Sequence, residues 1–156
     1  MRRRLGLFIA TVGYIGYAPV APGTFGSAAG LAVFYLVRAA GSTTVELAAI
    51  VAIFAIGIWS GTEAEHHFGG IDPGPVVLDE VLGMLITLAL LPVSGWGAFA
   101  GFLVFRVLDV IKPWPAGRLE GLPGGLGVMA DDAMAAVYGN IVMRALLWAA
   151  PAWFHA

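Results

Sequence analysis

Cysteine is absent from this sequence of 156 residues. Its absence excludes disulfide bonds, metal sites built on thiolates and a cysteine nucleophile, although it does not identify a cellular compartment. Charge is also scarce, because charged residues make up 12 % of the chain and the formal net charge is -2. No basic stripe accompanies these few charges, so the sequence gives no indication of a nucleic-acid partner.

Apolar residues are abundant instead: they form 60 % of the chain, come in long blocks and raise the mean hydropathy to +0.89. The length fits a single domain over residues 1–156. This composition is typical of membrane proteins rather than soluble domains. We therefore expect an all-α, multihelical integral membrane protein with about five main helices and an N-terminal segment that is interfacial or re-entrant.

Clusters of proline and glycine divide the apolar blocks and predict where helices begin and end. The expected main helices cover residues 24–40, 45–60, 76–91, 96–111 and a last stretch from 131 or 132 to about 149. The segments 61–74 and 112–130 are expected to be loops. Residues 1–17 resemble the start of a signal peptide, but Pro19 and Pro22 interrupt the cleavage region, so we expect this segment to be retained.

The charged residues are sorted along the chain. By the positive-inside rule, the arginines at positions 2–4 place the N-terminus in the cytoplasm. Alternation through the helices then puts three segments on that side: residues 1–23, 61–80 and 106–132. These segments hold nine of the ten acidic residues, all except Glu46, and every basic residue except Arg38 and Arg144. The sequence thus predicts chemistry at the cytoplasmic face of the membrane.

Asp79 and Glu80 are adjacent acids at the start of an apolar segment. Charges at membrane depth are rare and usually functional. Gly83 lies four residues after Asp79, on the same helix face, and allows another helix to approach closely. The simpler interpretation is that the two acids complement the helix dipole from its first turn. The apolar surroundings favour a functional role.

Arg106, Asp109 and Lys112 are spaced three residues apart, which places them on one face near the end of a helix. They could form an intrahelical ladder of ion pairs, or the cations could stabilise the helix C-terminus. A cation beside a carboxylate is also what a site for phosphate and metal requires. Both interpretations can hold together.

Gly124 and Gly125 begin a glycine-rich loop that leads to Asp131 and Asp132. Backbone N–H groups in such a loop could cradle an anion. Alternatively, the glycines are loop punctuation and one aspartate is the N-cap of the last helix. The other aspartate would then have no capping role and would be the better candidate ligand.

Two weaker signals remain. Thr24, a candidate N-cap, and Ser27 stand at a helix N-terminus with small residues, which suits an anion. Glu63 and His66 have a spacing known from metal-binding helices, but a single copy is more typical of a solvated helix face.

The type of metal follows from the available ligands. Carboxylates without cysteine or clustered histidine favour a hard cation, above all Mg²⁺, which binds through a few carboxylates and substrate phosphates. The sequence therefore predicts phosphoryl chemistry at a membrane surface.

Four stretches carry a resemblance to a known family: APGTFGS from residue 21, DPGPVVLDEVLG from 72, FRVLDVIKPWP from 105 and GGLGVMADD from 124. Together and in this order they resemble the phosphatidylglycerophosphatase A family, bacterial membrane enzymes that convert phosphatidylglycerophosphate to phosphatidylglycerol. The resemblance implies an all-helical, Mg²⁺-dependent lipid phosphatase, multi-pass in the bacterial inner membrane, with a phospholipid substrate.

Our mechanistic hypothesis is direct attack of a metal-activated water on the phosphate, in line with the departing lipid oxygen. One carboxylate could instead be the nucleophile. The expected metal ligands are Asp79, Glu80, Asp131 and Asp132, and the expected catalytic residues are these four and Asp109. The expected phosphate-binding residues are Thr24, Ser27, Arg106, Lys112, Gly124 and Gly125.

Other classes of protein fit the sequence less well. The lack of cysteine and of any D-x-D motif argues against the common covalent phosphatases. A small ion or proton transporter that uses the acidic cluster would need acids near the middle of its helices, whereas here they gather near helix ends. A non-catalytic assembly subunit would leave the four acidic motifs without a reason. The sequence does not indicate an oligomeric state.

Overall fold

The computed structural model describes residues 2–156, and this part of the chain is helical without a β-strand, as predicted. The main helices are α2 (Pro22–Arg38), α3 (Thr43–Phe68), α4 (Leu78–Leu88), α5 (Gly95–Ile111) and α7 (Gly125–Ala149). The shorter ones are α1 (Arg2–Ala10), the 3₁₀ turn η1 (Ile15–Tyr17), α6 (Ala116–Leu119) and α8 (Pro151–Phe154). Five main helices after a short N-terminal segment agree with the expected architecture.

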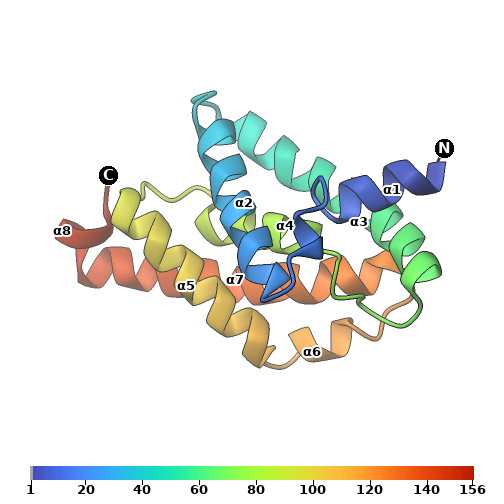
Figure 1. The fold of residues 1–156 in the computed structure, drawn as a ribbon. Helices are drawn as coiled ribbons and strands as arrows, with labels where there is room; N and C mark the ends of the chain where they lie inside the picture. The colour runs from blue at the N-terminus through green and yellow to red at the C-terminus, as the bar shows by residue number, and fades with distance from the viewer. Residues whose placement is uncertain (1) are drawn as a thin grey trace.

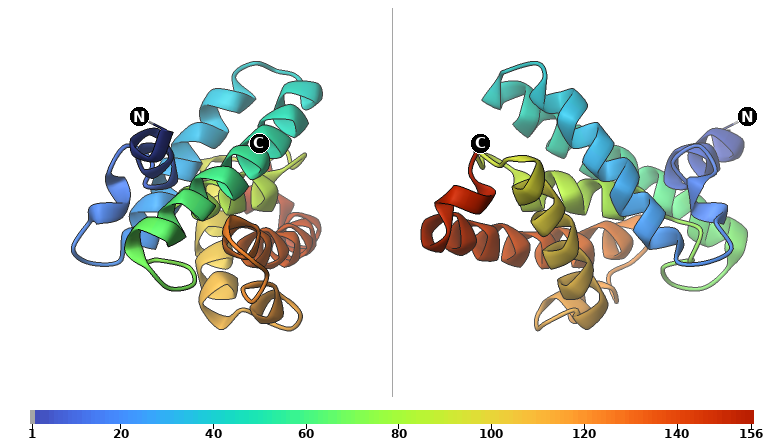
Figure 2. Two further views of the ribbon diagram at one scale, coloured as in Figure 1. Left: turned by 90° about the vertical axis from the view of Figure 1, so that its right-hand side faces the viewer. Right: turned by 60° about the vertical axis from the view of Figure 1, so that its left-hand side comes forward.

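The short helix α4 lies at the centre of the molecule, between α2 and α7 (Figures 1 and 2). Every residue of α4 except Ile86 is buried. Its apolar side chains join Phe34 of α2, Phe105 of α5 and Met143 of α7 in the main hydrophobic core. Because α4 is covered on all sides, the acids in its first turn are held in a fixed position.

Two glycines allow neighbouring helices to approach α4. A Cβ atom on Gly30 of α2 would lie 2.9 Å from both the Cα of Val81 and the Cβ of Met84. At Gly83 a Cβ atom would collide with the Phe105 ring, so the close helix contact expected at this glycine is present. Any larger residue at either position would push a helix away from α4.

The C-terminus of α4 is capped from outside. Asn140 of α7 donates from Nδ2 to three carbonyl oxygens of this terminus, those of Ile86 (3.1 Å), Thr87 (3.1 Å) and Ala89 (3.0 Å). Arg144, which has no evident partner in the sequence, donates from Nε to Oδ1 of Asn140 at 2.9 Å. Arg144 therefore orients the amide that satisfies the last carbonyls of α4.

The predicted loop over residues 61–74 is wrong in its first half, because α3 continues to Phe68. Gly61 does not end the helix: it is buried where α3 crosses α7, and its Cβ atom would lie 3.0 Å from the Cα of Gly125. The helix is terminated by its C-cap Gly69, which has a positive φ of 77°. Glu63 and His66 therefore lie on the last turns of α3.

The predicted start of the last helix is also wrong. The helix α7 begins at Gly125, so neither Asp131 nor Asp132 is its N-cap. Its first N–H group is satisfied by α3, because Gly125 donates to Oγ1 of Thr62 at 2.9 Å. Likewise α2 begins at Pro22 with Ala21 as the N-cap, so Thr24 lies inside the first turn and is not the cap.

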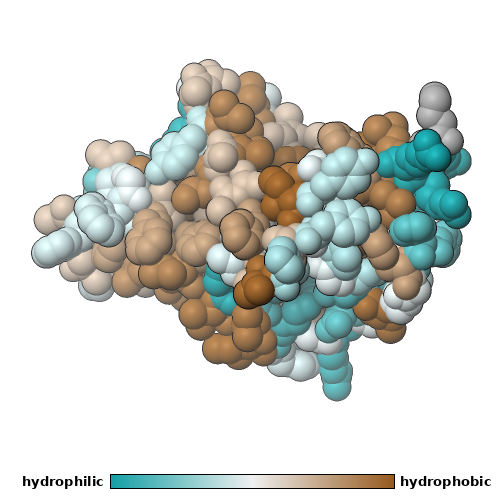
Figure 3. Space-filling model, in the orientation of Figure 1, coloured by the Kyte–Doolittle hydropathy of each residue, from teal (hydrophilic) through white to brown (hydrophobic). Residues whose placement is uncertain are grey.

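The charge-bearing segments meet at one end of the molecule. The α1 residue Arg2 lies 3.7 Å from Glu63 of α3, and Val77, just before α4, donates to the carbonyl oxygen of Ala10 at 2.9 Å. In Figure 3 the most hydrophilic colours gather on the right and lower centre, near α1 and α6, while hydrophobic colours prevail on the left. The turns after α2 and before α5 lie away from this polar end (Figure 1).

One helix of the described residues, α3, is long and apolar enough to cross a membrane. It has 26 residues, its most apolar window has a mean hydropathy of 1.9, and only 22 % of that window is buried. The N-terminal helix α1, with nine residues, is too short to span a bilayer.

Candidate active site

Three carboxylates from two helices converge at the polar end of α4. Asp79 and Glu80 stand in the first turn of α4, and Asp132 stands in the second turn of α7. One oxygen atom from each lies within 4.8 Å of the other two. All three residues are nearly inaccessible, with exposed fractions of 4 %, 9 % and 2 %. We call Asp79, Glu80 and Asp132 the acidic triad.

The acidic triad is suited to a cation. The oxygens Oδ1 of Asp79 and Oε2 of Glu80 are buried and have no hydrogen-bond partner among the described residues. Three buried carboxylates at this separation repel one another unless a positive charge lies between them or protons neutralise them. Oxygen-only ligands fit a hard ion such as Mg²⁺, which binds through a few carboxylates.

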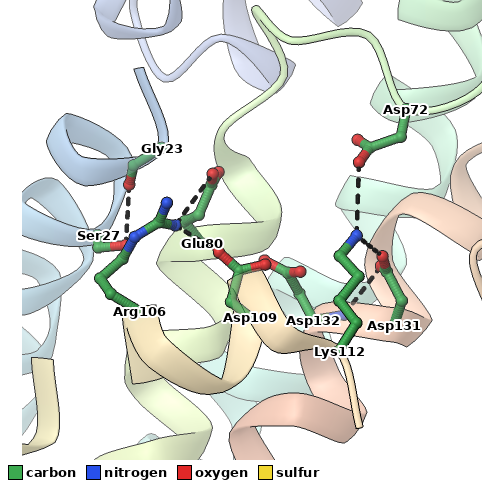
Figure 4. A network of polar contacts seen from close by, with 9 residues as sticks. All are labelled: Gly23, Ser27, Asp72, Glu80, Arg106, Asp109, Lys112, Asp131 and Asp132. Atoms are coloured by element: carbon green, nitrogen blue, oxygen red, sulfur yellow. Dashed lines mark hydrogen bonds and ion pairs between the residues drawn. The ribbon is translucent and has the colours of Figure 1, made fainter. Parts of the chain in front are cut away.

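A cation of the protein lies beside the acidic triad. Arg106 of α5 donates from Nη1 to Oδ2 of Asp109 at 2.5 Å, and the same nitrogen lies 3.6 Å from Oε1 of Glu80 (Figure 4). Arg106 and Asp109 thus form the i,i+3 ion pair of α5. The contact of Arg106 with Glu80 also links α5 to α4. Both contacts are made by Nη1, so the other nitrogens of the guanidinium group leave capacity for a further anion.

Lys112 is the centre of a second, neighbouring cluster. Its ammonium group forms an ion pair with Asp131 of α7 and lies 3.7 Å from Oδ2 of Asp72 (Figure 4). It also lies 3.9 Å from Oε2 of Glu120. Burial alone would lower the pKa of Lys112, but the hydrogen bond and charge of Asp131, with Asp72 nearby, raise it above its ordinary value. Lys112 therefore remains protonated and holds three segments of the chain together.

Asp131 and Asp132 are adjacent but face different neighbours. Asp132 contributes to the acidic triad, whereas Asp131 pairs with Lys112 and accepts the N–H group of Asp132 at 2.8 Å. Of the four predicted metal ligands, the structure thus brings Asp79, Glu80 and Asp132 together and leaves Asp131 outside their group.

Asp72 and Glu120 did not stand out in the sequence as site residues. Asp72 lies in the loop before α4, and burial raises its pKa to about 6, while the charge of Lys112 acts in the opposite direction. The sequence feature that could have identified Asp72 as a site residue is its position in the stretch DPGP, seven residues before Asp79. Glu120 follows α6 in a segment expected to be an irregular loop, which gave no indication of its contact with Lys112.

The predicted phosphate-binding loops have other contacts in the structure. The N–H group of Gly125 is used by Thr62, and a Cβ atom on Gly124 would meet the same threonine. Ser27 donates its hydroxyl to the carbonyl oxygen of Gly23 at 2.8 Å. Thr24 is exposed and does not line the cavity shared by Asp79, Glu80 and Arg106. A role for these residues in binding phosphate stays a prediction.

A cavity of about 240 Å³ connects the acidic triad with Arg106. It is lined by Ala21, Pro22, Gly23, Asp72, Gly74, Val76, Asp79, Glu80, Arg106, Asp109 and Asp132. The N-terminus of α2 forms one wall, and a Cβ atom on Gly23 would collide with Glu80 and approach Arg106. The cavity thus offers carboxylates for a metal on one side and a guanidinium group for an anion on the other.

The chain is similar to known proteins over most of its length. The family model of Phosphatidylglycerophosphatase A matches residues 8–147. A protein of Escherichia coli (strain K12) named phosphatidylglycerophosphatase A is 38 % identical over 124 residues, which cover 78 % of this chain and 72 % of the relative. The protein of that name in Haemophilus influenzae is 34 % identical, covering 81 % of this chain and 78 % of the relative.

A third relative has a different name. It is described as "Putative phosphatidylinositol-3-phosphatase" in Bacteroides thetaiotaomicron, and it is 34 % identical over 140 residues, covering 85 % of this chain and 87 % of the relative. No solved structure matches the chain. With a family match over almost its whole length and two relatives of the same name, the chain belongs to the phosphatidylglycerophosphatase A family.

Proposed function

We propose that this protein hydrolyses the phosphate monoester of phosphatidylglycerophosphate and releases phosphatidylglycerol and inorganic phosphate. The proposal rests on family membership and on one structural observation. That observation is the cavity in which the buried acidic triad, with its two unpartnered carboxylate oxygens, lies next to Arg106.

In this proposal the acidic triad holds Mg²⁺. A bound Mg²⁺ supplies charge neutralisation at the phosphate and lowers the pKa of a bound water. Arg106 binds the phosphate oxygens, since a guanidinium group fits a phosphate through two parallel hydrogen bonds. Asp109 orients Arg106 and, as a carboxylate lining the same cavity, exchanges the proton between water and the departing lipid alkoxide.

Lys112 has a supporting role. It is surrounded by Asp72, Glu120 and Asp131, so its charge is already balanced by the protein. We propose that Lys112 fixes the loop before α4 against α7 and thereby keeps Asp79 and Asp132 at their separation. This role differs from the direct phosphate contact expected from the sequence.

We also propose that the protein is a multi-pass protein of the bacterial inner membrane, with its cavity at the cytoplasmic surface. Three features support this placement: the span-like helix α3, the clustering of charged segments at one end, and a substrate whose acyl chains stay in the bilayer. The acids form a compact cluster at that end of the helices and do not follow a path along them, so the transporter alternative has no support.

The substrate range can be tested together with the activity. Two relatives carry the name phosphatidylglycerophosphatase A and one is named for phosphatidylinositol 3-phosphate. We would purify the protein in detergent and measure phosphate release from both lipids, with Mg²⁺ and with EDTA. We expect Mg²⁺-dependent release, faster from phosphatidylglycerophosphate.

Asp79→Asn is the decisive variant for this assay, and Glu65→Gln, which removes an acid of α3 outside the cavity, is its matched control. We expect the first to lose activity and the second to keep it. No release from folded wild-type protein with either lipid would refute the proposed function. If Asp79→Asn remains active, the proposed function still holds, but the acidic triad is not essential for it.

A further inference from the structure

A second polar cavity lies at the end of the molecule opposite the acidic triad. Its volume is about 340 Å³, which falls in the roughly 300–1,000 Å³ range of ligand pockets. Its lining includes Arg38 at the end of α2, Ser42, Thr43 and Glu46 at the start of α3, and Leu90 after α4. Since α2 begins at the catalytic cavity and has 17 residues, the two cavities lie roughly 25 Å apart along it.

Arg38 brings an unsatisfied donor to this cavity. Its Nη1 atom is buried and has no hydrogen-bond partner among residues 2–156, and no carboxylate of these residues lies within ion-pair distance. Its guanidinium carbon lies 5.4 Å from the centre of the Phe34 ring, which holds the side chain in place. A buried charged donor without an acceptor is costly, so an occupant with an anionic oxygen would satisfy Arg38.

Glu46 brings the opposite charge to the same cavity. It is only 7 % exposed, and its Oε1 accepts the backbone N–H of Leu90 at 3.0 Å. Its other oxygen has no hydrogen-bond donor among residues 2–156. Arg38 and Glu46 therefore line one cavity without pairing with each other. A ligand with a negative and a positive group can satisfy both, whereas a simple anion would be repelled by Glu46.

We propose that this second cavity binds a phosphate ester that carries a primary ammonium group, the chemistry of the phosphatidylethanolamine headgroup. Arg38 binds the phosphate oxygens and Glu46 accepts the ammonium N–H groups. The hydroxyl of Ser42 makes no capping hydrogen bond in α3 and is available as a further donor to the phosphate. If the protein crosses the membrane as proposed, this cavity lies at the opposite surface, where lipid headgroups are found.

The test is lipid retention by the purified protein, followed by native mass spectrometry. Three lipids with the same acyl chains separate the contributions: phosphatidylethanolamine, phosphatidylcholine, whose methylated ammonium donates no hydrogen bond, and phosphatidylglycerol, which has no ammonium. We expect phosphatidylethanolamine to be retained about tenfold better than the other two, the effect of one charge-assisted hydrogen bond. Equal retention of all three would overturn the proposal.

Variants assign the two halves of the headgroup. Arg38→Gln should lower retention of phosphatidylethanolamine about tenfold or more. Glu46→Gln should remove only its advantage over phosphatidylcholine and phosphatidylglycerol, because glutamine still offers an oxygen to the N–H of Leu90. Arg118→Gln, at the catalytic end, is the control and should retain lipid like the wild type. Unchanged selectivity in Glu46→Gln would refute the proposal even if Arg38→Gln failed to fold.

The same chemistry could come from a soluble molecule. Lipid-free protein in detergent is therefore heated with free phosphoethanolamine and, separately, with phosphatidylethanolamine. If the melting temperature rises with phosphatidylethanolamine but not with phosphoethanolamine, the membrane is the source of the ligand. If it rises with both, the headgroup alone is sufficient for binding. Arg38 and Glu46 must be needed for either rise, and a rise that persists in both variants would count against the proposal.

Discussion

Two pairs of adjacent acidic residues, Asp79–Glu80 and Asp131–Asp132, show that neighbouring carboxylates can have different roles in this protein. Asp79 and Glu80 join the acidic triad together, because they stand at the first turn of a buried helix. Asp131 and Asp132 separate, because they lie inside α7, where adjacent side chains point about a quarter-turn apart, and because Asp131 pairs with Lys112. Asp132 faces the triad and Asp131 faces Lys112.

This separation predicts different results for the two aspartates of α7. Asp131→Asn should weaken Mg²⁺ binding by roughly 10–100-fold, the effect of losing an outer contact. Asp132→Asn should weaken it more, because this change removes one of the proposed ligands. The measurement is the rise in melting temperature on titration with Mg²⁺, which does not depend on turnover. Equal effects would show that the two side chains share the metal.

Asp72 predicts a pH dependence of stability in the absence of metal. Burial raises its pKa from the ordinary 3.8 to about 6, so folding favours the protonated carboxyl group. Its contribution to stability is complete below its unfolded pKa and is lost as the pH rises through about 6. In EDTA the melting temperature should therefore fall between about pH 4 and pH 7, and Asp72→Asn should fall less over that window. Parallel curves for the two proteins would contradict the assignment.

At the scale of helices, the position of the site depends on how closely α2 approaches α4. Gly30→Val would place side-chain atoms against Val81 and Met84, where a Cβ atom alone is already within 2.9 Å. We expect a loss of about 1–3 kcal/mol in stability from overpacking. We also expect lower activity, since α2 carries Gly23 at the wall of the catalytic cavity.

The control for this change is Ala28→Val on the exposed side of α2. It adds the same branched side chain to the same helix and, unlike Gly30→Val, it lowers the helix propensity of its position, yet its effect on stability should stay within about 0.7 kcal/mol. Denaturation of both variants in the same detergent, together with phosphate release, separates packing from propensity. Similar losses in both would show that the close approach is not needed.

Helix boundaries and site residues were predictable to different degrees. The apolar blocks and the proline and glycine clusters indicate five main helices, and the acidic motifs indicate Asp79, Glu80 and Asp132. The extent of α3 and α7 was not predictable, because glycine is typical of loops, whereas Gly61 and Gly125 lie within these helices and pack against each other. Such a contact joins residues far apart in sequence, so no local pattern reveals it. The pairing of Lys112 with Asp131 likewise depends on a contact between distant elements, α5 and α7.

At the scale of the whole molecule, the sorting of charge predicts how the protein lies in a membrane. Ala40 lies in the turn after α2 and Trp96 in the first turn of α5, whereas His67 and Arg118 lie at the polar end; all four are exposed. The natural absence of cysteine allows each to be replaced singly by cysteine without background labelling. A membrane-impermeant thiol reagent should distinguish the two sets in intact cells.

We expect Ala40→Cys and Trp96→Cys to react with the reagent from outside, and His67→Cys and Arg118→Cys to react only after the membrane is opened. The reason is electrostatic: nine of the ten acids and six of the eight basic residues lie in segments at one end, and arginines near that end stay in the cytoplasm. Phosphate release confirms that each variant is folded. If all four sites react from the same side, the chain does not cross the bilayer, and the catalytic cavity and the cavity of Arg38 face the same compartment.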